Sequence, residues 1–190
     1  MKPFITFLVL AAFTLSGAAQ VAPSGAGVPP ASVKPKPYSA DDTRVYVTIA
    51  EGVRFQLVMS QRLVGSYQGS DPGMPAFASN LLQASTELWR SGVDAAMQHG
   101  VQGKKIPQDM SKNDQAALAK LGTIKDQKKG QIAFFELYAK ESKKNAADTE
   151  KGAKAAQDPD LKAYAEKAAG LLKTQAEAIE AKFKELKTKK

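Results

Sequence analysis

Apolar side chains recur every three or four residues along five segments of this chain, and this spacing places them on one face of an α-helix. The first segment begins near Ser39, whose hydroxyl, with Asp42 three residues later, forms the pattern of a helix capping box. One polar residue, Gln56, interrupts the apolar face of this segment, which contains Val45, Ile49, Val53, Met59 and Leu63. The pattern predicts a long first helix.

A second helix is predicted between the turn-forming residues 68–73 and Gly100, because glycine often follows the C-terminal end of a helix. Ser85 interrupts its face, which contains Phe77, Leu81, Leu88, Gly92, Ala95 and His99. A connector follows, and within it Ser111 and Asp114 begin a short helix that carries Leu118 and Leu121.

Two more long helices are predicted in the second half of the chain. The first spans about residues 126–156, and beyond Tyr138 its inner face consists of small residues, namely Ser142, Ala146, Thr149 and Ala153. Asp158 and Pro159 suit the start of the last helix. Gln175 interrupts the apolar face of that helix, made by Leu161, Ala165, Ala168, Leu172, Ile179, Phe183 and Leu186. Since no segment of useful length alternates as a strand does, the fold class is predicted to be all-α.

The N-terminal residues have the pattern of an export signal. Lys2, an apolar run over residues 4–15 and a group of small residues indicate a signal peptide over residues 1–19, cleaved after Ala18 or Ala19. Residues 20–38 are rich in Pro, Gly and Ala and are predicted to form a disordered tether before a helical domain of residues 39–190. We therefore expect a periplasmic or secreted protein with no transmembrane segment in the mature chain.

The composition excludes several kinds of reaction centre. The chain has no cysteine, so disulfides, thiolate nucleophiles and cysteine metal sites are absent. A single histidine cannot supply the two imidazoles of a di-iron bundle or of a His-Glu-x-x-His zinc site. That residue, His99, is expected to meet the exposed carbonyls at the end of its own helix. We expect a protein that is not an enzyme, with no cofactor and no catalytic or metal-ligating residue.

The three residues that interrupt the apolar faces, Gln56, Ser85 and Gln175, form a candidate polar cluster in the core. Their amide and hydroxyl groups can bond to one another, and such bonding is needed because a buried polar group without a partner costs about 1–3 kcal/mol. The formal net charge is +8, one unit less after removal of Lys2. The candidate contacts to an anionic surface are lysines near the C-terminus: Lys184, Lys187, Lys189 and Lys190. The expected partners are anionic envelope components or another envelope protein, and not nucleic acid.

Several short motifs follow one another along the helical part: Ala50-Glu51-Gly52, Pro75-Ala76-Phe77-Ala78, Gly100-Val101, Lys105-Ile106-Pro107, the stretch 114–121, Phe134 with Tyr138, and the stretch 158–163. In order and spacing they resemble a bacterial family of exported ferritin-like bundles, domain of unknown function 4142, over Ala40 to about Leu186. The resemblance implies a ferritin-like four-helix bundle with a short extra helix between helices two and three. The family pattern has a glutamate at Gln56 and histidines at Ser85, Ala146 and Gln175, so the resemblance implies a degenerate member that lacks these groups.

Three functions are compatible with these features. The leading hypothesis is a non-catalytic binding or structural module of the cell envelope. One alternative is a ferritin-like metal-binding or redox and stress protein that uses carboxylate ligands alone. The other is a binder of small apolar ligands, which predicts a cavity beside Ala146, Thr149 and Ala153.

Overall fold

The computed structural model describes residues 35–66 and 71–188, and all regular structure within these ranges is helical. The elements are α1 (Ala40–Ser66), α2 (Met74–Gln98), a 3₁₀ turn η1 (Gly103–Lys105), α3 (Lys112–Leu121), α4 (Gln127–Ala155) and α5 (Pro159–Thr188). The predicted all-α class is confirmed. Each predicted helix lies where the apolar pattern places it, with ends that differ by a few residues.

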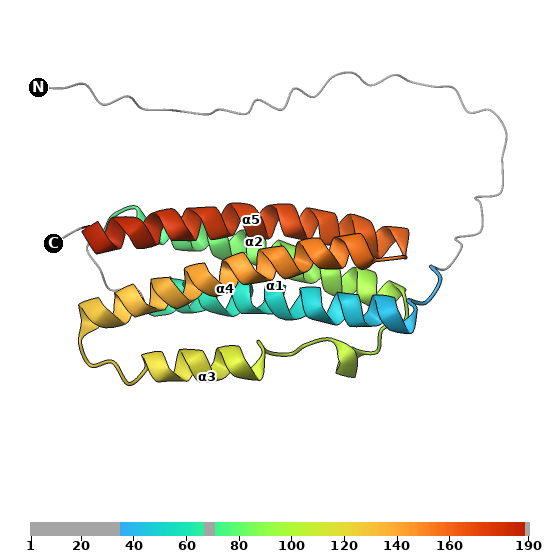
Figure 1. The fold of residues 1–190 in the computed structure, drawn as a ribbon, viewed down its shortest axis with the longest axis horizontal. Coiled ribbons are helices and arrows are strands. Elements are labelled where there is room, and N and C mark those ends of the chain that lie inside the picture. The colour runs from blue at the N-terminus through green and yellow to red at the C-terminus, as the bar shows by residue number, and fades with distance from the viewer. Residues whose placement is uncertain (1–34, 67–70, 189–190) are drawn as a thin grey trace, which may run out of the picture. The chain divides into compact units, whose positions relative to one another are not determined.

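The four long helices pack side by side around one core (Figure 1). α1 contacts α2 and α4, and α5 contacts α4 and α2. Because α2 and α4 run in the same direction, the chain between them must return along the length of the bundle, and η1 and α3 lie on this return path (Figure 1). The molecule is therefore a four-helix bundle with one long crossover connection, and the short extra helix lies in that connection as predicted.

The helix ends follow the predicted capping residues. Ser39 Oγ accepts the backbone N–H of Asp42 at 3.0 Å, and Ser111 Oγ accepts that of Asp114 at 3.2 Å. Asp158 Oδ1 accepts the backbone N–H of Leu161 at 3.0 Å at the start of α5. Each bond satisfies a backbone donor that the first turn of a helix leaves without an intrahelical partner.

The buried apolar side chains form two clusters along the bundle. The first gathers the beginning of α1, the ends of α2 and α4 and the beginning of α5, around Tyr46, Leu88, Leu161 and Leu172. The second gathers the opposite ends of the same helices with the beginning of α4, around Phe55, Leu81, Phe135 and Ile179. The polar residues that interrupt the helix faces in the sequence lie between the two clusters.

The packed part of the chain begins slightly earlier than the predicted boundary at Ser39. The backbone N–H of Tyr38 donates to the His99 carbonyl at 3.0 Å, and the two rings stack with centroids 4.3 Å apart. The predicted signal peptide, and the predicted tether up to residue 34, lie outside the described residues. Among the helices that are described, none is long and apolar enough to cross a membrane.

Candidate functional site

A layer of neutral polar side chains crosses the middle of the bundle, with one residue from each long helix. Gln56 Nε2 in α1 donates to Ser142 Oγ in α4 at 2.6 Å. Gln175 Nε2 in α5 donates to Ser85 Oγ in α2 at 3.2 Å. All four residues are at most 4% exposed. The structure thus brings Ser85 and Gln175 of the predicted cluster together, but it pairs Gln56 with Ser142, which the sequence did not single out.

The layer continues from Gln56 toward the second apolar cluster. Ser60 Oγ donates to the backbone carbonyl of Gln56 at 2.8 Å, and the Tyr138 hydroxyl lies 2.8 Å from Ser60 Oγ. Burial raises the pKa of Tyr138 well above its ordinary value, although the Ser60 hydrogen bond acts in the opposite direction. The phenol therefore remains neutral, as the other members of the layer do.

Two oxygen atoms in this layer have no hydrogen-bond partner among the described residues: Oε1 of Gln56 and Oε1 of Gln175. They are neutral amide acceptors, which suit an N–H or O–H donor such as a water molecule. A di-iron centre in a bundle needs several inward glutamates and an imidazole for each metal. Amides, hydroxyls and one phenol do not fit such a centre.

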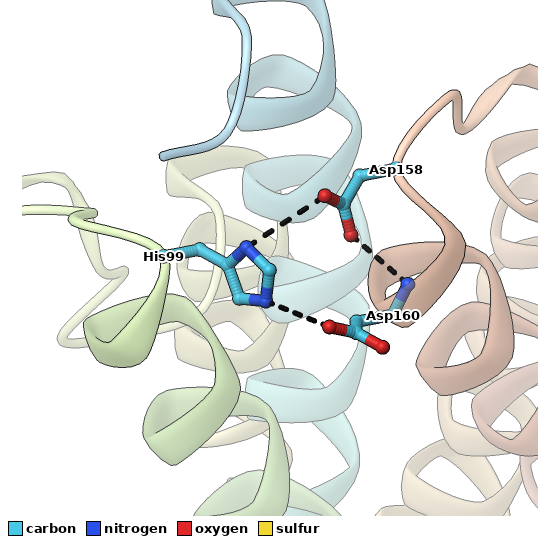
Figure 2. Close-up of side chains that lie close together, drawn as sticks. All are labelled: His99, Asp158 and Asp160. Atoms are coloured by element: carbon cyan, nitrogen blue, oxygen red, sulfur yellow. Dashed lines mark hydrogen bonds and ion pairs between the residues drawn. The ribbon is translucent and has the colours of Figure 1, made fainter. Parts of the chain in front are cut away.

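A second group of polar side chains lies at the end of the bundle where α2 stops and α5 begins. His99 is 4% exposed and lies between Asp158 and Asp160 (Figure 2). Its Nδ1 is 2.7 Å from the Lys36 carbonyl and 3.7 Å from Asp158 Oδ2, while its Nε2 is 3.2 Å from Asp160 Oδ2. Both ring nitrogens therefore face oxygen atoms of other segments.

This geometry corrects the sequence prediction for His99. The ring does not bond to the carbonyls of its own helix but contacts two distant segments, the one that contains Lys36 and the start of α5 with Asp158 and Asp160. The sequence could not show this, because the contacts span 59 or more positions along the chain and depend on how the helices pack. His99 holds segments of the fold together here, as a structural residue would.

The same three side chains are the one group of potential metal ligands of this kind within the described ranges, with ligand atoms inside 4.8 Å of one another. Their arrangement is not that of a closed site. Asp158 lies beside Nδ1 and Asp160 beside Nε2 (Figure 2), so the two carboxylates do not converge on one nitrogen. Asp158 also uses Oδ1 to accept backbone N–H groups at the start of α5.

The C-terminal lysines proposed from the sequence have neighbours of their own where the structure describes them. Lys184 Nζ lies 3.3 Å from Glu180 Oε1, and Lys187 Nζ lies 5.0 Å from the centre of the Phe183 ring. Lys189 and Lys190 lie outside the described residues. Lys184 and Lys187 are exposed, but the Glu180 carboxylate offsets the charge of Lys184.

The crossover connection and the first turn of α4 together carry a larger group of lysines, which was not predicted as a contact region. Residues 103–129 contain three aspartates and seven lysines, and all seven lysine side chains are exposed: Lys104, Lys105, Lys112, Lys120, Lys125, Lys128 and Lys129. In the part of the chain that the structure describes, none of the seven forms an ion pair, whereas seven lysines of α4 and α5 do. We call these seven residues the connector lysines. Their spacing in sequence could have revealed them, but their lack of partners could not be read from it.

An open groove of about 940 Å³ lies between α3 and the adjoining parts of α1 and α4. Its walls include Leu118 and Leu121 of α3, Leu63 of α1, and Phe134 of α4. Arg62 and Lys128 line it as well, so an apolar surface and two cationic side chains border the same space.

A family profile described as a domain of unknown function, DUF4142, matches residues 28–181, which is most of the chain. The chain belongs to the DUF4142 family. No curated protein matches this DUF4142 chain, and no solved structure matches it.

In this DUF4142 bundle, the four positions where the family pattern has a glutamate or a histidine do not all lie together. Gln56, Ser85 and Gln175 lie in the polar layer, but Ala146 is only partly buried and lines an open groove of about 580 Å³ between α4 and α5. Ala153 lines a neighbouring open groove of about 410 Å³, and Thr149 is packed in the core. Beside these residues the structure thus has two open surface grooves bordered by lysines and glutamates, in place of the predicted apolar cavity.

Proposed function

We propose that this DUF4142 protein is an exported, non-catalytic binding module that associates with anionic material of the cell envelope through the connector lysines. The observation that carries the proposal is the concentration of exposed lysines without ion pairs along the crossover connection. Lysines in excess over acidic groups on one part of a surface produce a positive potential that attracts anionic neighbours and weakens in salt.

The distribution of ion pairs supports the connector over the C-terminal helix as the contact region. In α4 and α5, lysines such as Lys143, Lys154 and Lys184 lie within 4 Å of a glutamate. The aspartates of the connector, by contrast, are engaged locally: Asp114 accepts from Ser111, and Asp126 caps α4. With seven lysines and three aspartates in residues 103–129, positive charge predominates in the connector.

Export itself is supported by the sequence of residues 1–19, with its basic start, apolar run and small residues. An exported protein with this charge meets anionic lipid head groups and envelope polymers before it meets nucleic acid. Each lysine near an anionic membrane surface contributes about 1 kcal/mol of attraction. Several connector lysines acting together are sufficient for measurable association.

The test uses the mature chain and co-sedimentation with vesicles that contain phosphatidylglycerol, against vesicles of phosphatidylcholine alone. We expect binding to the anionic vesicles that decreases as salt is added. One variant changes four connector lysines to glutamine: Lys120, Lys125, Lys128 and Lys129. Its affinity for the anionic vesicles is expected to be lower by about tenfold or more. The control changes four exposed lysines of α4 that each lie within 4 Å of a carboxylate: Lys140, Lys144, Lys151 and Lys154. Equal loss in both variants, or no association with either kind of vesicle, would show that the proposal is wrong.

A carboxylate-based metal protein is the second candidate, and the proximity of His99, Asp158 and Asp160 is the observation in its favour. Metal analysis of the purified protein tests it directly. A stoichiometric transition metal that disappears in a His99→Asn variant would favour this function. Because the carboxylates lie beside different ring nitrogens, we expect no such stoichiometry.

A further inference from the structure

We infer that the groove between α3, α1 and α4 is a binding site for a fatty carboxylate, with the acyl chain along the apolar wall and the head group at the cationic side chains. This inference rests on the proposed association with anionic envelope material and names one ligand class for the same side of the molecule. Three features of the groove support it: its apolar wall, its charge and its size.

The apolar wall is formed by side chains that the rest of the bundle does not fully cover. Phe134 is partly exposed, and its ring packs edge-on against Phe135 and Tyr138 with centroids 5.7 and 5.9 Å away. Val58 of α1 and Leu121 of α3 are also partly exposed and face the same space. Burial of such a surface by an acyl chain yields about 25 cal/mol for each Å² removed from water.

The polar part of the lining favours an anion over a cation. Lys128 is exposed and forms no ion pair within the described residues, and Arg62 on α1 is a second exposed cation in the lining. The amides of Gln127 and Gln131 add neutral donors. Asp109 is the acidic residue of the lining, and its Oδ1 accepts the backbone N–H of Met110 at 2.8 Å. Lys128 is thus the cation of the lining that complements a carboxylate.

The size and the walls of the groove suit one acyl chain. A volume of about 940 Å³ is within the range of about 300–1,000 Å³ that small-molecule sites occupy. α3 forms one wall and packs mainly against α4. With ten residues it is about 15 Å long, which limits the covered part of the ligand to about that length.

The experiment is a calorimetric titration of the mature chain with palmitate, with dodecylammonium as a probe of opposite charge. Ala119 is exposed and lines the groove, so Ala119→Trp fills the space without a change in the core. Ala116 is exposed on the same helix and does not line the groove, so Ala116→Trp is the matched control. We expect saturable palmitate binding that Ala119→Trp abolishes and Ala116→Trp preserves.

Charge is tested by Lys128→Glu, which we expect to weaken palmitate binding by about tenfold or more through loss of a charge-assisted contact. The inference is wrong if both tryptophan variants bind palmitate equally, if dodecylammonium binds as well as palmitate, or if no palmitate binds. If palmitate fails while the anionic vesicles still bind, the proposed function survives and the inference falls. If palmitate binds and the vesicles do not, the groove site survives and the proposed function falls.

Discussion

The buried carboxylate of Asp42 in α1 accepts the backbone N–H of Gln157 at 2.8 Å, and so joins the first helix to the loop between the last two. The same carboxylate accepts the Ser39 hydroxyl at 2.8 Å and lies 3.3 Å from the Asp158 backbone nitrogen. Burial alone would raise the pKa of Asp42, but the hydrogen bonds from Gln157, Ser39 and Asp158 outweigh it and hold the pKa below 3.8.

The first prediction concerns this carboxylate. A lowered folded-state pKa means that Asp42 stabilises the fold above its unfolded-state pKa of about 3.9, and this contribution is lost as the pH falls through the folded-state value. Asp42→Asn is expected to lower the free energy of unfolding at neutral pH by about 1.5–3 kcal/mol, the range for hydrogen bonds to a charged group. Urea denaturation at neutral and acidic pH measures both effects.

The neighbouring Asp41 provides the control for this prediction. It is exposed and pairs with Arg44 one turn later, so Asp41→Asn is expected to change stability by less than about 1 kcal/mol. If the two variants lose the same amount of stability, the long-range contacts of Asp42 are not what stabilises this end of the bundle.

A second prediction concerns the close approach of α2 and α5. A Cβ atom at Gly92 would overlap the hydroxyl and ring of Tyr164, whereas nothing lies within 4 Å of a Cβ at Gly170. Gly92→Ala is therefore expected to destabilise the bundle by about 1–3 kcal/mol through overpacking. Gly170→Ala, at an exposed position of α5, is expected to stabilise it by about 0.5–1 kcal/mol. Thermal unfolding of both variants measures these changes in stability. If both variants are stabilised, or both destabilised, the packing described is contradicted.

The third prediction separates the two members of the Gln175–Ser85 pair. Ser85→Ala leaves a buried amide with the Leu81 carbonyl at 3.5 Å as its remaining partner and is expected to cost about 1–3 kcal/mol. Adding Gln175→Leu removes the amide with its unpaired Oε1, so the double variant is expected to regain most of that loss. A double-mutant cycle compares the free energies of unfolding of the unchanged protein, the two single variants and the double variant, all measured by urea denaturation. Additive losses would mean that the two side chains do not interact.

A fourth prediction tests the role of His99 at the bundle end. His99→Phe keeps a ring to stack on Tyr38 but removes the contacts with the Lys36 carbonyl and Asp160. Hydrogen exchange at the Tyr38 amide, which donates to the His99 carbonyl, is expected to accelerate because the segment before α1 is held less firmly. Met97→Phe is the control, since Met97 is 62% exposed on the last turn of the same helix. Equal acceleration in both variants would count against the role of the imidazole.

The fold could be predicted in detail because its information is local. Each helix is marked by apolar residues at helical spacing, and pairs such as Ser39 with Asp42 fix a start through bonds that span three positions. The polar layer could be predicted in part, because a glutamine inside an apolar face, such as Gln56 or Gln175, stands out in the sequence. Ser142 does not stand out in this way, because a serine among other small residues does not interrupt an apolar pattern.

Contacts between distant segments could not be predicted in this way. Because α1 packs against both α2 and α4, whether Gln56 bonds to Ser85 or to Ser142 depends on the rotation and register of the packed helices, and the order of the helices in the chain does not determine these. The partners of His99 and the groove beside α3 depend on the same arrangement. The sequence also directed attention to the C-terminal lysines, since it does not show which lysines have acidic neighbours in the fold.

The division of the core by the polar layer has a consequence for how the molecule unfolds. Each long helix runs through the layer and contributes side chains to the apolar cluster on either side of it. Neither cluster has helices of its own, so melting one cluster frees helical segments on which the other depends. Two hydrophobic cores therefore belong to one cooperative unit, and damage at one end of the bundle is transmitted to the other through the helices themselves.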